Sequence, residues 1–483
     1  MHFAMIGDLA AAAPSNFIYL VPLAAGMIML MQAGFGLIET GLGRAKNVAH
    51  TMSMNLLVYV LGMTGFFVCG YALMCGGIGS PLAAAVTGPP DAQTTANELI
   101  TLTIGRHSWG IVAFKGFFLS SLARSPSSAS WFLLMSVLMS VAVAVPTGAN
   151  VERWKIKSFF IFSLIAGAWI YPIYGCWVWG GGWLAQLGVN AHLAHGVVDY
   201  SGSCVIHLVG GSLAFAAACV IGPRLGKYDE SGDPRPIFGH HVPMVILGTL
   251  IVAFGWFALN CGRSLAAGDE QAGIIGMNTA LASAAGALAA ALYMWRVYGK
   301  PDPSVICNGM LGGLVASSAG CAFFSPLAAF LIGAAAGMLT AMGVIFLEKR
   351  GIDDPVGAIS VHGFNGIWGT LAVGLFANGS FGDGYNGVAG PVAGLFYGGG
   401  FSQLLCQLIA VVVCVTWSVA SALGALTIIG RFELSNRVTA EVEIAGLDIP
   451  EMGAPGYPEF ISHVGAEQIP PSQITAARAR DGA

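Results

Sequence analysis

Charged side chains are scarce in this chain. Lysine, arginine, aspartate and glutamate make up 9% of the 483 residues, and hydrophobic residues make up 56%. An ordinary soluble domain carries roughly 25% charged residues, so the composition excludes a soluble globular protein and predicts an integral membrane protein. The bilayer is thus the expected surroundings of the chain. The formal net charge of −4 indicates no further partner, and we expect no nucleic-acid partner.

Several chemical signatures are also missing. The ten cysteines include no C-x-x-C pair, and nine of them lie in or at the ends of apolar segments, where cysteine acts as a small hydrophobe. No stretch resembles the phosphate-binding motif G-x-x-x-x-G-K-[ST], and no nucleophile and base converge in a polar pocket. We therefore expect no disulfide, metal site or cofactor, and no enzymatic activity.

Long apolar runs are what the sequence has in abundance. A hydrocarbon core of about 30 Å requires around 20 apolar residues per helix, and eleven such segments recur. They are expected at about 17–39, 52–76, 130–149, 158–181, 200–222, 242–262, 272–297, 304–322, 326–347, 359–377 and 393–428. The last is too long for one straight crossing, so it is expected to tilt or to project from the membrane.

Basic residues fall mostly in alternate loops. With the N-terminus outside, sixteen of the twenty lie inside, and four lie outside: Arg106, Lys115, Arg124 and Arg263. Because positively charged loops stay in the cytoplasm, we expect an all-α membrane protein with N-out/C-in topology. Its transmembrane domain would cover 1–430, and a cytoplasmic tail would cover 431–483.

Two histidines lie deep inside apolar segments. His207 occurs in "VVDYSGSCVIHLVGG" and His362 in "DDPVGAISVHGFNGIWG", and each follows an aspartate, Asp199 or Asp354, by eight residues. The two segments are the fifth and the tenth, so five steps separate them and reverse the chain direction. This pattern predicts two inverted five-helix repeats, with a functional site near the membrane midplane where they meet.

The repeats would span about 17–222 and 242–377, followed by the long eleventh helix over 393–428. A solitary buried histidine most often only binds a neighbouring carbonyl group. Two imidazoles at equivalent places can instead share one proton and titrate as a pair. We expect such a pair to relay a proton or to hydrogen-bond a small polar solute.

The sequence resembles the ammonium transporter family, the Amt branch of Amt/Mep/Rh, along nearly its whole length. The resemblance is carried, in order, by "MQAGFGLIETGLGRAKN" (31–47), "YPIYGCWVWGGGWL" (171–184), "VVDYSGSCVIHLVGG" (197–211), "GWFALNCGRSLAAGDEQAG" (255–273), "DDPVGAISVHGFNGIWG" (353–369) and "GLDIPEMGAPGYPEF" (446–460). It implies a homotrimer of eleven-helix protomers in the cell membrane (inner or plasma), each with its own narrow pore.

In this family, ammonium is selected at an outer vestibule and loses its proton, and the nitrogen crosses a hydrophobic pore. The positions similar to the family's pore histidines are His207 and His362. Asp199 matches the acidic residue that organises recruitment, although an aspartate there could also cap a helix. Trp179 matches the tryptophan that contacts the ammonium ion through its ring, although an interfacial tryptophan would also fit.

The sequence departs from the family pattern at the outer site. Two stacked phenylalanines usually cover the pore entrance, and the corresponding positions are Leu138 and Leu259. Arg263 stands where the family usually has a serine, with Ser264 directly after it. A permanently charged guanidinium would repel a cation at this position.

Two placements of this arginine are open. Arg263 could turn outward to pair with Asp269 or Glu270, which would leave Ser264 or a backbone carbonyl to recruit ammonium. It could instead point inward at Asp199 and fill the cation site. The first placement predicts ammonium transport, and the second predicts slow conduction, an ammonium sensor or a channel for another small neutral solute.

The polar tail after Ile429 contains the Amt-like stretch "GLDIPEMGAPGYPEF". In this family, the segment docks on the cytoplasmic face and couples protomers, and a PII-type signalling protein can bind nearby. Separately, His192 and His195 in "HLAH" are interpreted as solvated loop residues rather than metal ligands, because no further ligands accompany them.

Overall fold

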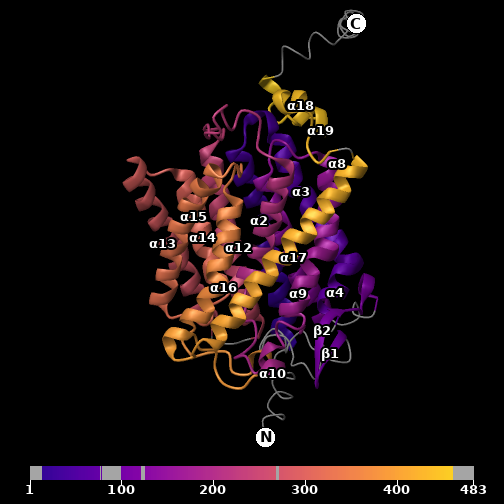
Figure 1. Cartoon of the computed structure of the whole chain (residues 1–483), viewed down its shortest axis with the longest axis vertical. Coiled ribbons are helices and arrows are strands. Elements are labelled where there is room, and N and C mark those ends of the chain that lie inside the picture. Colours follow the sequence, from indigo (N-terminus) through magenta and orange to yellow (C-terminus); the bar gives the residue numbers. More distant parts are fainter. Residues whose placement is uncertain are drawn as a thin grey trace, which may run out of the picture.

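The computed structural model describes residues 14–76, 78, 99–120, 126–267, 271–433 and 435–460. The described chain forms a bundle of long helices that run roughly parallel to one axis of the molecule (Figure 1). Predicted helix ends differ from the observed ends by a few residues in such apolar sequences, because caps and turns rather than hydropathy set where a helix ends.

The bundle consists of long helical segments, several of them continued by π-helical turns. They are α2 (Pro14–Leu42); α3 (Val48–Gly65) continued by η2 (Phe66–Gly70) and α4 (Tyr71–Cys75); α7 (Pro126–Ala149); α8 (Ile156–Ile165) continued by η4 (Ala166–Ile170) and α9 (Tyr171–Trp179); η5 (Ser203–Leu208) with α11 (Val209–Ile221); α12 (Val242–Ala267); α13 (Ala272–Tyr298); α14 (Pro303–Ser318); α15 (Pro326–Lys349); η6 (Ile359–Phe364) with α16 (Asn365–Phe376); and α17 (Ser402–Glu433).

Ten of these segments are long and apolar enough to cross a membrane, and α14 is shorter, with 16 residues. The molecule is therefore an all-α membrane protein in its bulk. The predicted eleventh helix was placed wrongly at its start. Gly398 and Gly400 have positive φ angles of 83° and 68°, which break the helix, so α17 begins only at Ser402. In Figure 1, α17 slants across the face of the bundle, as its length requires.

A β-hairpin interrupts the all-α pattern. Strands β1 (Leu99–Ile104) and β2 (His107–Ala113) pair antiparallel, with Ile104 opposite His107 at the turn. Short elements elsewhere are α10 (Leu187–Ala191), α18 (Ala440–Ala445), α19 (Asp448–Met452) and the 3-10 turns η1 (Ala45–Asn47), η3 (Phe117–Leu119), η7 (Tyr385–Gly387), η8 (Leu395–Tyr397) and η9 (Pro458–Phe460).

The connecting segments gather at two opposite ends. Figure 1 places β1, β2 and α10 at one end, here called the hairpin end, and α18 and α19 at the other, here called the tail end. Ion pairs hold the tail end together. Arg44 pairs with Glu152, and Arg224 pairs with Glu152 and Asp353, which joins segments that are distant in sequence, while Arg437 pairs with the nearby Glu443. Arg44, Arg224 and Arg437, which come from three segments predicted to lie on one side, thus share one end of the molecule.

Glycines allow the helix backbones to approach closely, as expected for small residues in membrane helices. A Cβ atom on Gly34 of α2 would lie 2.8 Å from the carbonyl oxygen of Gly248 in α12, and one on Gly248 would lie 2.6 Å from that of Gly34. A Cβ atom on Gly211 of α11 would lie 2.3 Å from the backbone nitrogen of Gly363 in η6. The second contact brings together the two segments that carry His207 and His362.

Candidate functional site

The structure brings His207 and His362 into direct contact. Their Nδ1 atoms are 3.1 Å apart, and their ring centroids are 5.1 Å apart with an interplanar angle of 26°. Both residues are buried, with exposed fractions of 0% and 4%. A contact of this length between two ring nitrogens requires one nitrogen to donate and the other to accept, so the pair holds a hydrogen between its two rings.

Each histidine lies in a π-helical turn that is held by an aspartate. The Asp199 carboxylate accepts hydrogen bonds from the backbone N–H groups of Gly202, Cys204 and Val205 at 2.8–3.0 Å. The Asp354 carboxylate accepts from Ala358 and Ile359 at 3.0 and 2.7 Å. Both aspartates thus satisfy free N–H groups at a helix start, and the wide turns η5 and η6 that follow are of the kind often found at functional sites.

Aromatic rings enclose the histidine pair. The ring of His207 stacks on Trp256 with centroids 4.7 Å apart, and the Trp256 Nε1–H donates to the Ser318 hydroxyl at 3.0 Å. The ring of His362 meets Phe35 edge-on at 6.1 Å. His207 Nε2 has no hydrogen-bond partner among the described residues, so a polar atom of this pair remains available in an otherwise apolar interior.

Toward the hairpin end, Trp179 contacts the backbone of Asp199. Its Nε1–H donates to the Asp199 carbonyl oxygen at 2.7 Å, so the indole positions the aspartate. Burial raises the pKa of Asp199 to about 6, and its backbone hydrogen bonds oppose this shift. Leu138 and Leu259 are buried in the same hydrophobic core as Trp179, with exposed fractions of 4% and 3%. Ser264 is fully buried.

Arg263 points into the molecule. Its side chain is buried, and Nη1 donates to the carbonyl oxygen of Tyr200, the residue after Asp199, at 2.8 Å. The guanidinium carbon lies 5.3 Å from the centroid of the Tyr200 ring, which is a favourable cation–π arrangement. Asp269 and Glu270, the predicted partners in the outward placement, lie outside the described residues.

Arg263 and Asp199 both influence the hydroxyl group of Tyr385. Burial raises the pKa of Tyr385 to about 12, while the charge of Arg263 lowers it and that of Asp199 raises it. Both charges therefore act on one buried hydroxyl at the hairpin end. The described contacts thus place Arg263 beside the backbone of the Asp199 segment.

A small cavity lies on the other side of the pair. It has a volume of about 30 Å³, and His362 and Glu39 both line it. Glu39 was not singled out from the sequence, although a carboxylate inside a membrane-spanning segment is rare and usually functional. The signal was available in "MQAGFGLIETG", where Glu39 stands at the end of a predicted span.

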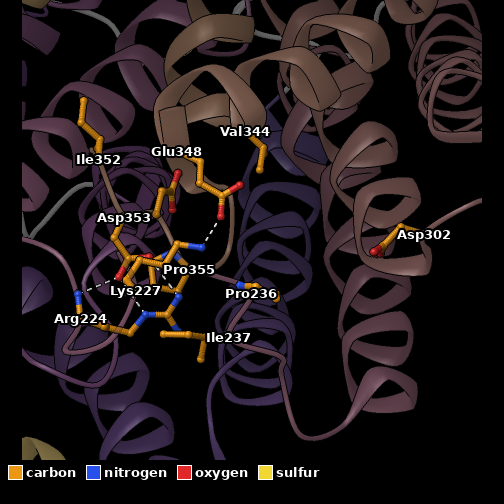
Figure 2. A pocket seen from close by; sticks show the side chains of 11 residues that line it. Arg224, Lys227, Pro236, Ile237, Asp302, Val344, Glu348, Ile352, Asp353 and Pro355 are labelled. Atoms are coloured by element: carbon orange, nitrogen blue, oxygen red, sulfur yellow. Dashed lines mark hydrogen bonds and ion pairs between the residues drawn. The ribbon is translucent and has the colours of Figure 1, made fainter. Parts of the chain in front are cut away.

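Beyond this cavity, charged residues line a pocket of about 250 Å³ at the tail end. Figure 2 shows Arg224 and Lys227 reaching Asp353 and Glu348, with Asp302 apart from them. The Arg224 Nε atom lies 2.8 Å from an Asp353 carboxylate oxygen. Burial raises the pKa of Asp353, but the hydrogen bonds and charge of Arg224 outweigh burial and bring it to about 2.

The tail residues up to 460 dock on the tail end of the same chain. The Asp448 carboxylate accepts from the backbone N–H of His50 at 2.9 Å, and Glu451 accepts from that of Ile156 at 2.8 Å. The backbone of Val438 donates to the Arg153 carbonyl at 3.1 Å. The predicted final residues from about 468 lie outside the described chain.

The interpretation of "HLAH" as a solvated pair is wrong for His195. His192 is exposed, but His195 is buried, and its Nε2 atom lies 2.8 Å from the Gly390 carbonyl oxygen. The loop 377–401 folds over it, which the sequence could not show because a long-range contact between two loops buries the ring.

Known proteins resemble this chain along most of its length. Residues 19–457 match the model of the Ammonium Transporter Family. The ammonium transporter Amt2 of Archaeoglobus fulgidus is 40% identical over 437 residues, covering 90% of this chain and 86% of that protein. Ammonium transporter 1 member 3 of Solanum lycopersicum is 30% identical over 460 residues, covering 92% and 93%.

Solved structures show the same fold. A structure described as a sensor Amt protein superposes with a TM-score of 0.77 at 30% identity, and the match covers 92% of this chain and all of that one. The crystal structure of Saccharomyces cerevisiae Mep2 superposes with a TM-score of 0.72 over 90% of this chain and 91% of that one, at 22% identity. The second likeness concerns the fold alone.

Proposed function

The chain belongs to the ammonium transporter family, whose members are transporters rather than enzymes, and from this premise we propose that it carries ammonium across the membrane through its histidine pair. The observation that carries the proposal is the contact between His207 and His362 inside an apolar interior. Ammonium is bound at the hairpin end, loses its proton there, and crosses as ammonia past the two rings.

The energetics of the bilayer support this sequence of steps. A bare cation inside the hydrocarbon region costs several kcal/mol or more, whereas a neutral molecule does not. The apolar surroundings of the pair therefore disfavour potassium and sodium, which cannot shed their charge. The rings supply hydrogen-bonding nitrogens along this path, and because they share one hydrogen they can also pass a proton from one side to the other.

At the hairpin end, Asp199, Trp179 and Ser264 are proposed to form the recruitment site. The Asp199 carboxylate accepts hydrogen bonds from three backbone N–H groups. These bonds position the backbone carbonyl group of Asp199, and the carboxylate supplies negative charge to the site. The Trp179 ring offers a face to a cation. Leu138 and Leu259 replace the aromatic cover with an aliphatic seal.

The arrangement in the membrane is part of the proposal. Eleven crossings with α14 as the short one, two inverted repeats, and an N-out/C-in orientation agree with basic residues gathered at the tail end. We place the protein in the cell membrane as a homotrimer, with the docked tail facing the cytoplasm. A PII-type signalling protein is the expected partner of that face.

A second candidate function is an ammonium sensor with little flux. Arg263 favours it, because its inward guanidinium brings a fixed positive charge to the segment that would recruit a cation. One of the structural relatives is itself described as a sensor. A channel for another small neutral solute would satisfy the same charge argument.

Currents after an ammonium jump, recorded from purified protein in liposomes on a solid-supported membrane, separate these candidates. A transporter gives a clear wild-type current that is absent with potassium, and Arg263→Ser raises it severalfold by removing the competing charge. No wild-type current but a clear one for Arg263→Ser would contradict the transporter proposal and support the sensor. No current and no nitrogen flux in either protein would support the neutral-solute channel.

A further inference from the structure

Glu39 is a buried carboxyl group within the membrane-spanning part of α2. Its side chain is buried, with 4% of the residue exposed, and polar groups from α3 and α7 contact the carboxyl group. The Asn55 side-chain amide donates to Oε2 at 2.7 Å, and the Thr147 hydroxyl oxygen lies 2.7 Å from both Oε1 and Oε2. No structural feature described above requires a carboxyl group here, where an amide could make similar contacts.

The hydrogen bonds around Thr147 accommodate a proton on this carboxyl group. The Thr147 Oγ1 atom also lies 2.6 Å from the Ala144 carbonyl oxygen, but a hydroxyl carries only one hydrogen. With Glu39 ionised, that hydrogen serves either Ala144 or Glu39. With Glu39 protonated, Thr147 donates to Ala144 and accepts from the protonated oxygen of the carboxyl group, so both Ala144 and Glu39 have a hydrogen bond with Thr147. The site therefore suits both protonation states.

Glu39 and His362 share one cavity. Its volume of about 30 Å³ exceeds the roughly 10–15 Å³ that one water molecule needs. Apart from Glu39, His362 and Asn308, the lining is apolar, with Phe35, Ile38, Val145, Leu311, Val356, Ala358 and Val361. A proton that leaves His362 toward the tail end thus meets Glu39 as the acidic group of this cavity.

Consecutive residues line the cavity and the tail-end pocket. Val356 lines the cavity, and Asp354 and Pro355, its neighbours in sequence, line the pocket of Figure 2. The charged and titratable groups that face Glu39 are His362 across the cavity and Asp354, whose charge acts on it. His207 contacts His362, His362 shares the cavity with Glu39, and Asp354 lines the neighbouring tail-end pocket.

We propose that Glu39 is the proton acceptor on the tail-end side of the histidine pair. In this step, an N–H bond of protonated His362 breaks and an O–H bond forms on the Glu39 carboxylate, directly or through one water molecule. The proton then passes to ammonia or water in the tail-end pocket, and no atom changes oxidation state. The inference rests on the proposed transport function and specifies how charge accompanies the nitrogen.

The test measures two quantities in the same liposomes: current after an ammonium jump, and internal pH with a trapped dye. Wild-type protein that moves ammonia together with a proton gives current and little alkalinisation. Glu39→Gln keeps the size of the side chain and its contact with Thr147 but cannot accept the proton. We expect its current to fall at least tenfold while ammonia entry alone makes the interior alkaline.

Two further variants separate proton transfer from packing. Glu39→Asp retains a carboxyl group and is expected to keep at least a third of the current per transported nitrogen. Gln32→Met changes another buried polar residue of α2, which donates to Ser140 at 3.1 Å and does not line the cavity, and it is expected to keep the wild-type ratio. Size-exclusion profiles of all variants verify that each is folded.

The outcomes for Glu39 and for transport differ. If Glu39→Gln lowers current and nitrogen flux in equal proportion, or changes neither, the residue is structural and the inference is wrong, although transport stands. If the wild type moves nitrogen without current, Glu39 has no proton to accept and the inference also fails. If the wild type moves no nitrogen at all, the proposed function itself fails.

Discussion

The eight-residue spacing between an aspartate and a histidine has a direct structural reason. Asp199 and Asp354 each bind the free N–H groups at a helix start, and the histidine follows within the π-helical turn that this start creates. The repeated spacing therefore places His207 and His362 at equivalent depths, where their Nδ1 atoms meet. This pattern can be recognised in the sequence because each aspartate lies only eight residues before its histidine.

The carboxylate of Asp353 is expected to make stability depend on pH. Its pKa of about 2 lies below the ordinary value of 3.8, so its contribution of about 2 kcal/mol is present above pH 4 and is lost as pH falls toward 2. Asp353→Asn removes the carboxylate that binds Arg224 most closely and leaves this arginine with Glu152 as its ion-pair partner. We expect it to cost about 3 kcal/mol at neutral pH and to remove this acid dependence. Thermal unfolding in detergent at pH 6 and pH 3 measures both effects.

Asp302→Asn is the matched control for that prediction. Asp302 lines the same pocket, but it is exposed and caps α14 by accepting from Ser304 at 2.8 Å, and asparagine caps a helix about as well as aspartate. Its unfolding temperature should stay near that of the wild type at both pH values. An Asp353→Asn protein with the same acid dependence as this control would show that the ion pair contributes nothing.

Other residues of the site could not be assigned from sequence. Arg263 was recognised as anomalous, but its direction depends on the position of Tyr200, which lies on another segment. Glu39 was overlooked, since its role follows from sharing a cavity with His362 rather than from a motif. Local spacing predicts what one segment does, whereas contacts between distant segments decide where a flexible side chain points.

At the level of elements, the crossing of α11 and η6 depends on Gly211. A Cβ atom there would lie 2.3 Å from the Gly363 nitrogen, whereas a Cβ atom on Gly363 would have its nearest neighbour at 3.7 Å. Gly211→Ala is therefore expected to push the two segments apart, to destabilise the protein by about 1–3 kcal/mol and to lower transport at least tenfold. Unfolding temperature and ammonium current measure the two effects.

Gly363→Ala provides the comparison, because it adds the same methyl group to the facing backbone. It should leave stability within about 1 kcal/mol of the wild type, as expected for a glycine-to-alanine change in a helix, and should keep most of the current. Equal losses in both variants would mean that the close approach of these backbones is not what sets the histidine contact.

The elements were predictable to the extent that hydropathy defines them. Every expected apolar segment corresponds to a helix, because the bilayer allows few other structures. The hairpin β1–β2 was missed, since short strands between spans carry no such constraint. The start of α17 was misplaced because the positive φ angles of Gly398 and Gly400, and not a loss of hydrophobicity, keep the residues before Ser402 out of the helix.

In the whole molecule, the ion pairs and the docked tail lie at the same end. Basic residues, their acidic partners and the tail share one end, and the hairpin and the Asp199 segment face the other. The molecule thus has the two buried histidines between a hairpin end and a tail end that is rich in ion pairs. The proposed pathway, in which ammonium sheds and regains a proton, uses this difference between the two ends.

The central claim is that the histidine pair lets nitrogen cross where cations cannot. The most direct measurement compares ammonium-jump and potassium-jump currents in liposomes for the wild type and for His207→Ala combined with His362→Ala. We predict a wild-type current with ammonium and none with potassium, and in the double variant either no ammonium current or a comparable potassium current. An unchanged ammonium current with unchanged selectivity in the double variant would contradict the account.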